Sequence, residues 1–306
     1  MKKSLISIFD LTAEEIKEIL ETAHSIKKKH AEGETPSLLK GKILGLIFQK
    51  PSTRTRVSFE AGMKQLGGET ISLDIGESQL SRGETIADTA RVVSKYLNGI
   101  VMRGEHKFLL EFSKYASIPV INGLTEVSHP CQILSDLLTI QEAGKNFKNL
   151  RLTFVGDGNN ICHSWMFAAG KLGINLVVCV PSGYEPDENI MKKAKTDALK
   201  SGGEIKLIQD PHKGVENADI IYTDTWVSMG QESETKKRLH DFKPYQVNEK
   251  LLKFASAGCL VMHCLPAHRE QEITSEVLDG KNSIVWEQAE NRLHAQKAIL
   301  ALWLGK

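Results

Sequence analysis

The sequence predicts an α/β protein with two open parallel-sheet α/β domains and a C-terminal helix that crosses back to the first domain. Short apolar runs alternate with helical patterns along the chain, which is typical of a parallel sheet covered by helices on both faces. A polar segment rich in lysine and asparagine, residues 144–150, interrupts this alternation before it restarts. The chain has 306 residues, enough for two domains.

The first half contains the pattern of four strands and their helices. A capping box at Thr12 and Glu15 predicts where the first helix starts, because the two side chains can satisfy each other's backbone N–H groups. A further helix follows the turn at residue 52. Strands are predicted at 43–48, 69–73, 99–102 and 120–122, and the remaining helices at 83–96, 108–115 and 132–142.

The second half repeats this organisation with five strands. The final segment, 288–304, is amphipathic and long enough to return to the first domain. We therefore expect one domain of residues 1–144 plus 288–306, and a second of 145–287. Strands are predicted at 152–155, 175–180, 205–208, 220–223 and 260–263, and helices at 159–171, 188–200 and 248–254.

Composition is that of a soluble globular protein, with 41% apolar and 25% charged residues and a net charge of +1. This balance argues against a nucleic-acid or membrane surface. We expect no membrane span, since no apolar run approaches 18 residues, and no signal peptide. Five cysteines without a C-x-x-C pair fit a reducing compartment, so a cytoplasmic location is expected.

The most informative segment runs from Ser52 through Thr53, Arg54 and Thr55 to Arg56, between a predicted strand and a predicted helix. A helix N-terminus offers unpaired N–H groups, and hydroxyl and guanidinium groups add donors that suit phosphate oxygens. The segment therefore predicts a phosphate-binding turn, but not a nucleotide P-loop, whose glycine–lysine pattern is missing. The alternative is an ordinary serine cap beside solvated arginines.

Three further residue clusters in or near this first domain offer groups that can hold a polar ligand. Arg103 follows a strand, where it can reach an anion or a carbonyl oxygen, and a surface arginine is the alternative interpretation. His129 lies just before a predicted helix, where it can donate to a carbonyl oxygen or simply cap the helix, while Gln132 can hold an amine or amide. Arg292 lies near the start of the last predicted helix, where it can close the anion site. The alternative interpretation is an exposed arginine.

In the second domain, a G-x-G turn at 156–158 follows a strand but lacks the third glycine and the later acidic residue of a dinucleotide site. A turn that directs Asn159 or Asn160 at a polar ligand is the better interpretation. Asp224 follows another strand and can pair with an ammonium group. Ser228 and Met229 lie in the loop beyond it, which we interpret as a ligand lid rather than a surface turn.

Cys264 follows the last predicted strand, directly after His263. It is a candidate for thiolate chemistry, and a buried structural cysteine is the alternative. A zinc site is poorly supported, because no second ligand pair accompanies Cys259 and Cys264. Neighbouring strand residues point to opposite faces, so His263 is not expected to act as a base for Cys264, which argues against a cysteine-dependent amidase.

Together, residues 52–56, 129–132, 224–230 and 263–266 resemble the aspartate/ornithine carbamoyltransferase family, and their order covers nearly the whole chain. The resemblance implies transfer of the carbamoyl group of carbamoyl phosphate to L-ornithine. It implies trimers, or multiples of them, in which a loop bearing Gln79 completes the neighbouring subunit's site. The implied carbamoyl-phosphate-binding residues are Ser52, Thr53, Arg54, Thr55, Gln79, Arg103, His129, Gln132, Cys264, Leu265 and Arg292.

The resemblance also implies how the remaining residues act. The catalytic set is Arg54, Arg103, His129, Cys264 and Arg292, and the ornithine-binding set is Asn160, Asp224, Ser228 and Met229.

The chemistry needs no metal or organic cofactor, because the leaving phosphate can accept the amine proton and donors can stabilise the oxyanion. Ornithine suits the loop at 224–231 better than aspartate, which would need an arginine there. Putrescine, which lacks a carboxylate, and N-acetylornithine, which lacks the α-ammonium, fit less well. A non-catalytic, anion-binding regulator is the alternative from another class of protein.

Overall fold

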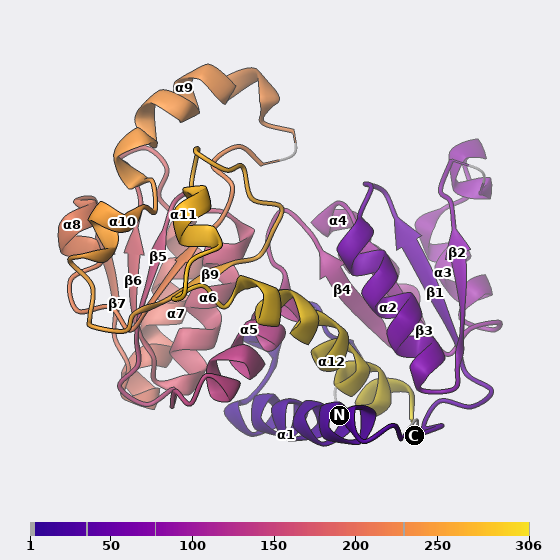
Figure 1. The fold of residues 1–306 in the computed structure, drawn as a ribbon. Helices are drawn as coiled ribbons and strands as arrows, with labels where there is room; N and C mark the ends of the chain where they lie inside the picture. The colour runs from indigo at the N-terminus through magenta and orange to yellow at the C-terminus, as the bar shows by residue number, and fades with distance from the viewer. Residues whose placement is uncertain (1–3, 35, 77, 229, 306) are drawn as a thin grey trace. The chain divides into compact units, whose positions relative to one another are not determined.

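The structure, a computed structural model, describes residues 4–34, 36–76, 78–228 and 230–305 (Figure 1). The chain divides into two compact units, Met1–Leu138 with Glu290–Lys306, and Thr139–Ala289. Two helices, α5 (Pro130–Glu142) and α12 (Val285–Leu304), carry the chain from the first unit to the second and back. Each unit contains its own parallel sheet, so the predicted fold class is confirmed.

The sheet of the first unit has the strand order β2-β1-β3-β4. Every neighbouring pair is parallel. Because the chain moves to one side of β1 to form β2 and to the other side to form β3, the sheet has a switch point between β1 and β3, where ligands of such sheets bind. The strands are β1 (Ile43–Phe48), β2 (Glu69–Leu73), β3 (Gly99–Arg103) and β4 (Val120–Leu124).

Helices cover both faces of this first sheet. In Figure 1, α2 lies in front of the sheet and α3 behind it. The face toward α3 and α4 is filled by apolar side chains such as Ile47, Ile100 and Phe112. The C-terminal part of α12 packs on this unit, since a Cβ at Gly62 of α2 would lie 3.2 Å from Lys297. The helices are α1 (Ala13–Ala31), α2 (Thr53–Gln65), α3 (Ile86–Val93) and α4 (His106–Tyr115).

The sheet of the second unit has the order β7-β6-β5-β8-β9, again parallel throughout. Its switch point lies between β5 and β8. Successive residues face opposite sides, as strand geometry requires: Tyr222 of β8 contacts Trp165 of α6, while Ile221 belongs to the core on the other face. The strands are β5 (Arg151–Val155), β6 (Asn175–Cys179), β7 (Ile205–Ile208), β8 (Ile220–Thr223) and β9 (Leu260–His263).

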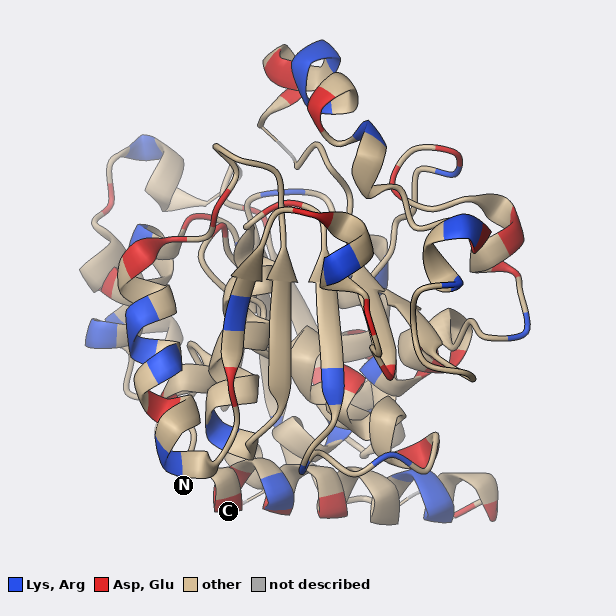
Figure 2. Cartoon of the chain, turned by 90° about the vertical axis from the view of Figure 1, so that its left-hand side faces the viewer, with Lys and Arg blue, Asp and Glu red and all other residues tan. Residues whose placement is uncertain are grey.

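Two long helices and several short ones complete the second unit. In the view of Figure 2, basic and acidic residues are interspersed along the helices and loops, in line with the small net charge. Over the described ranges, no helix has the length and apolar content needed to cross a membrane. The helices are α6 (Asn160–Leu172), α7 (Glu188–Ser201), α8 (Pro211–Gly214), α9 (Thr235–Asp241), α10 (Glu249–Leu252) and α11 (Ser275–Leu278).

All nine predicted strands are present, and the predicted capping box of α1 forms, with Thr12 and Glu15 bonded reciprocally at 2.8 and 3.1 Å. The helix predicted at 83–96 is shorter, because Gly83 has φ +95° and ends a preceding 3-10 turn. The helix predicted at 248–254 keeps only the residues of α10. The sequence pattern did not predict α9, whose residues are mostly charged.

Candidate active site

The Ser52 turn lies at the switch point of the first sheet, between β1 and α2. Ser52 occupies the N-cap position with extended backbone, φ −158° and ψ 116°, yet its side chain makes no capping hydrogen bond within the described chain. The ordinary serine-cap interpretation is therefore not supported. Thr53 and Arg54 are exposed, whereas Thr55 is buried. The turn thus leaves hydroxyl and guanidinium groups at the end of the helix where anions bind.

Arg292 joins three helices that are far apart in sequence. Its Nη1 donates to Oε1 of Gln132 on α5 at 2.6 Å, and its Nη2 donates to Oγ1 of Thr55 on α2 at 3.1 Å. The Gln132 amide nitrogen donates in turn to Oδ1 of Asp136 at 2.8 Å. The structure therefore brings together three of the predicted anion-site residues, and both ends of the Gln132 amide have partners within the chain.

Positive charge accumulates around this group. Burial, together with the nearby charges of Arg292 and Arg54, lowers the pKa of Arg103 to about 10. The Nε of Arg103 is buried and has no hydrogen-bond partner among the described residues. The charges of Arg292 and Arg54 repel that of Arg103, so an anion placed among them would relieve the repulsion.

His129 lies in the same field. His129 is 3% exposed, and burial followed by the charges of Arg292, Arg103 and Arg54 holds its pKa well below the usual range. The imidazole is therefore neutral near pH 7 and offers one N–H donor and one acceptor nitrogen. A neutral donor of this kind suits a carbonyl oxygen, and this role of His129 stays a prediction.

Two other residues of the first unit lie on its surface. Gln79 is exposed at the start of a 3-10 turn, η2 (Gln79–Arg82). Arg56 forms an exposed ion pair with Glu60, 3.7 Å between Nε and Oε1. Neither joins the hydrogen bonds of Arg292 in the part of the chain that the structure describes.

Asp224 is the centre of the corresponding region in the second unit, at the switch point after β8. Its Oδ2 accepts from Nδ2 of Asn159 at 2.8 Å. Its Oδ1 accepts from the backbone N–H of Thr225 at 2.8 Å and from the thiol of Cys264 at 3.0 Å. Asp224 is only 8% exposed, so these donors replace much of the hydration of its carboxylate.

The turn after β5 explains why Asn159, rather than its neighbour, reaches Asp224. Asn159 is the N-cap of α6 and accepts from the N–H groups of Ile161 and Cys162, which leaves its amide nitrogen directed at Asp224. Asn160 is the first residue of α6 and is half-buried. A Cβ at Gly158 would lie 2.3 Å from the nitrogen of Pro186, so this glycine serves a close backbone contact rather than a dinucleotide.

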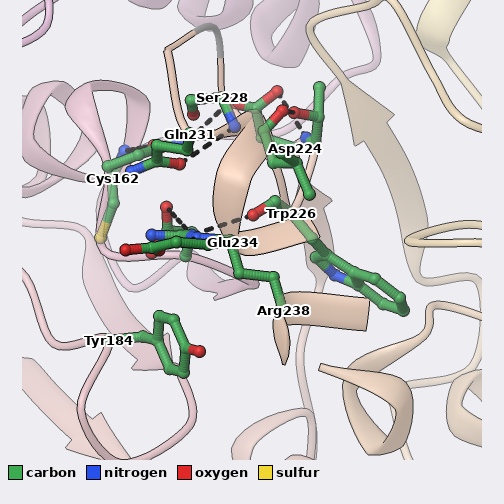
Figure 3. A network of polar contacts seen from close by, with 12 residues as sticks. Cys162, Tyr184, Asp224, Trp226, Ser228, Gln231, Glu234 and Arg238 are labelled. Atoms are coloured by element: carbon green, nitrogen blue, oxygen red, sulfur yellow. Dashed lines mark hydrogen bonds and ion pairs between the residues drawn. The ribbon is translucent and has the colours of Figure 1, made fainter. Parts of the chain in front are cut away.

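The loop beyond Asp224 is held by a network that sequence reasoning missed (Figure 3). Arg238 of α9 donates to the carbonyl of Trp226 at 3.0 Å and pairs with Asp157 at 2.9 Å and with Glu234 at 2.9 Å. Burial raises the pKa of Asp157, and Arg238 opposes that shift. In the sequence, Glu234 and Arg238 show only the i,i+4 spacing of an ordinary surface pair.

Of the two loop residues predicted to bind ligand, Ser228 is half-buried, and its N–H donates to Oε1 of Gln231 at 3.1 Å. Met229 lies outside the described residues. Figure 3 shows Ser228 and Gln231 near the top of the network and Arg238 below, beside Trp226.

The prediction that His263 and Cys264 point to opposite faces of a strand is wrong. Strand β9 ends at His263, so strict alternation no longer applies at Cys264, and donor atoms of Asp224, His263 and Cys264 all lie within 4.8 Å of one another. His263 nevertheless has no ring nitrogen to spare. Its Nδ1 accepts from the N–H of Leu265 at 2.8 Å, and its Nε2 lies 3.0 Å from Oε1 of Glu272.

These bonds decide what the cluster can do. A histidine with both nitrogens engaged is a poor base for Cys264 and a poor metal ligand without rearrangement. Cys264 is half-buried, whereas the other four cysteines are buried. The arrangement therefore presents an accessible thiol beside a carboxylate, which suits recognition of an amine.

The chain is similar to known proteins over nearly its whole length. Residues 3–142 match the family model described as aspartate/ornithine carbamoyltransferase, carbamoyl-P binding domain, and residues 148–303 match the Asp/Orn binding domain of the same family. An ornithine carbamoyltransferase of Pyrococcus horikoshii is 54% identical over 304 residues, which cover 99% of this chain and 96% of the relative.

Solved structures are similar over the same length. The ornithine carbamoyltransferase of Pyrococcus furiosus has a TM-score of 0.96 at 54% identity, covering 99% of this chain and 97% of the other. The anabolic ornithine carbamoyltransferase of Campylobacter jejuni has a TM-score of 0.93 at 38% identity, covering 99% of both chains. The chain therefore belongs to the aspartate/ornithine carbamoyltransferase family.

Proposed function

We propose that this protein transfers the carbamoyl group of carbamoyl phosphate to the δ-amine of L-ornithine, giving L-citrulline and phosphate. The observation that carries the proposal is the cationic group of Arg54, Arg103 and Arg292 at the first sheet's switch point, in the unit that matches a carbamoyl-phosphate-binding domain. The relatives named ornithine carbamoyltransferase, matched over almost the whole chain, support ornithine as the acceptor.

Carbamoyl phosphate binds the domain formed by residues 1–144 and 288–306. Its phosphate is held by the Ser52 turn, where Thr53, Arg54 and Thr55 supply donors. The carbamoyl group is held by donors from other elements of the fold, which also stabilise the oxyanion as it develops. These donors are Arg103, His129, Gln132 and Arg292.

Ornithine binds the domain formed by residues 145–287. Asp224 pairs with the α-ammonium group, and the donors that contact both of its oxygens hold the carboxylate in position for it. Asn160 and the backbone near Ser228 and Met229 take the α-carboxylate. N-acetylornithine would leave Asp224 without its ammonium partner, and aspartate would bring a second carboxylate to a loop without an arginine.

The reaction follows from these positions. The neutral δ-amine attacks the carbonyl carbon, the C–O bond to phosphate breaks, and the leaving phosphate takes the amine proton. Positioning of the two substrates supplies much of the rate, so neither a metal ion nor an organic cofactor has a task. Cys264 and Leu265 lie beside the reacting amine, and Cys264 forms no covalent bond to the carbamoyl group.

Assembly and setting complete the proposal. Gln79 is exposed on the first unit and acts on the site of a neighbouring subunit in a homotrimer or a multiple of it. The reaction takes place in the cytoplasm and serves arginine biosynthesis, as the word anabolic in the name of the Campylobacter jejuni relative suggests.

The function is tested by incubating the protein with carbamoyl phosphate and each of ornithine, putrescine, N-acetylornithine and aspartate. Phosphate release and the carbamoylated product are measured together. We expect citrulline and phosphate in equal amounts with ornithine alone. Faster product formation from another amine would replace the acceptor, and binding of carbamoyl phosphate without turnover of any amine would favour the regulator.

The shared site is tested by mixing two variants, Gln79→Ala and Arg54→Ala, at a carbamoyl phosphate concentration too low for either variant alone to turn over measurably. If Gln79 works in a neighbouring subunit, some mixed trimers contain one intact site, and activity returns. Activity that stays absent in trimers shown to have exchanged subunits would contradict the proposal.

A further inference from the structure

A buried pair near the second switch point has no role in the function proposed so far. Glu272 is 0% exposed and His263 is 1% exposed. Oε1 of Glu272 accepts from the backbone N–H of His268 at 2.6 Å and lies 3.0 Å from Nε2 of His263. A buried carboxylate is costly unless donors surround it, so this arrangement demands an explanation.

The hydrogen bonds determine which nitrogen of His263 carries its proton. The backbone N–H of Leu265 can only donate, so the Nδ1 that it contacts at 2.8 Å must be an unprotonated acceptor. The proton therefore lies on Nε2, where Glu272 accepts it. A carboxylate on the far side of the ring is the usual means of selecting one histidine tautomer.

The group that His263 Nδ1 holds through this hydrogen bond is the backbone of Leu265. Leu265 has φ +58°, in the left-handed region that residues with a Cβ seldom occupy. Such a conformation persists only where its surroundings enforce it, and it is often found at functional sites. The hydrogen bond from its N–H to His263 is one such restraint, and His263 is itself anchored by its own N–H, which donates to Gln288 at 2.9 Å.

We propose that Glu272 and His263 are positioning residues that hold the strained backbone of Leu265 in place for carbamoyl transfer. Glu272 fixes the Nε2–H tautomer of His263, and His263 Nδ1 then holds the Leu265 N–H. This rests on the proposed function, in which Leu265 lies beside the reacting groups. Glu272 and His263 act through the backbone of Leu265, so their effect falls on turnover.

Two substitutions at one position separate the two bonds of His263. In His263→Asn, the amide oxygen lies close to the former Nδ1 and can still accept from Leu265, but the contact with Glu272 is lost. In His263→Gln, the longer side chain can still reach Glu272 but offers no acceptor to Leu265. Both variants remove one ring from the core, so their thermal stabilities should fall by similar amounts.

The measurement is kcat with saturating carbamoyl phosphate and ornithine, beside the thermal midpoint of each variant. We expect His263→Asn to exceed His263→Gln by about tenfold in kcat, since one hydrogen bond at the reacting position is at stake. Equal kcat values, or a loss that simply follows the thermal midpoint, would overturn the positioning role. Wild-type protein is assayed in parallel, and its inactivity would instead refute the proposed function.

Discussion

The two switch points of the molecule are built from opposite electrostatic arrangements. In the first unit, burial and the charges of Arg292 and Arg54 lower the pKa of Arg103, and Arg103 keeps a buried Nε without a partner among the described residues. In the second unit, the carboxylate of Asp224 already has donors on both oxygens. The cations around Arg103 in the first unit repel its charge until an anion binds among them, whereas the carboxylate of the second unit has hydrogen-bond donors before its ligand binds.

The difference teaches how each region selects its ligand. Repulsion among fixed cations makes the first unit selective for charge, because any dianion of the right size relieves it. The second unit instead selects by geometry, because a preorganised carboxylate and thiol accept only an amine placed correctly. Substitutions should therefore affect the first unit through binding and the second unit through the stability of its loops.

The largest effect is expected from Arg238→Met. This change leaves Asp157 buried without its partner, which should lower the free energy of unfolding by about 3–5 kcal/mol. It also frees the Trp226 carbonyl, so KM for ornithine should rise while KM for carbamoyl phosphate changes little. Chemical denaturation and steady-state kinetics measure the two effects.

The same substitution has a predictable dependence on pH. Burial raises the pKa of Asp157 above its unfolded value, and loss of Arg238 raises it further. A group of this kind binds more protons in the folded state, so the variant should be less unstable at pH 5 than at pH 8. The double variant Asp157→Asn/Arg238→Met should recover much of the stability, and a single variant as stable as wild type would contradict the assignment.

The next effect concerns binding to the first unit. Arg54→Ala should weaken carbamoyl phosphate binding roughly tenfold to a hundredfold, because a charged hydrogen bond contributes about 1.5–3 kcal/mol. Arg56→Ala is a matched control two residues along the same helix, where the side chain pairs with Glu60 at the surface. Calorimetry that shows equal affinities for the two variants would refute the phosphate-binding turn.

The sequence predicted the fold, and it singled out Thr55, Gln132 and Arg292, which meet in the first unit. It could do so because the relevant patterns are local. Strand ends, the Ser52 turn and the Asp224 loop can each be recognised within ten residues. The network of Arg238 and Asp157 joins positions that are 81 residues apart, and no local pattern reveals such a pair. The alternation rule failed at Cys264 for a similar reason, since it depends on where β9 ends.

A smaller effect is expected from Cys264→Ala. The variant removes one hydrogen bond to Asp224, worth about 1 kcal/mol, so KM for ornithine should rise roughly fivefold while activity persists. Cys264→Ser keeps a hydrogen-bond donor, so its KM for ornithine should lie between those of the wild type and Cys264→Ala. Complete loss of turnover, with a carbamoyl adduct of Cys264 trapped in mass spectra of the wild type, would show that the thiol acts covalently.

The smallest effect is expected from Lys297→Met. It tests whether burial or repulsion between cations lowers the pKa of Lys297 in the first unit. Lys297 is 1% exposed and donates to Gln65 at 3.0 Å, and burial alone lowers the pKa of Lys297 to about 8. Its unfolded pKa is about 10.4. Between these values the unfolded chain binds more protons, so stability should rise with pH.

Lys297→Met should lack this rise, so wild type should gain up to roughly 1 kcal/mol relative to the variant between pH 7 and pH 10, with allowance for solvent screening. Denaturation curves at both pH values measure the difference. Added salt should leave it nearly unchanged, because salt screens repulsion between charges and not the cost of burying one. A difference that disappears at high salt would mean that Lys297 belongs, with Arg103, to the repelling cations of this unit.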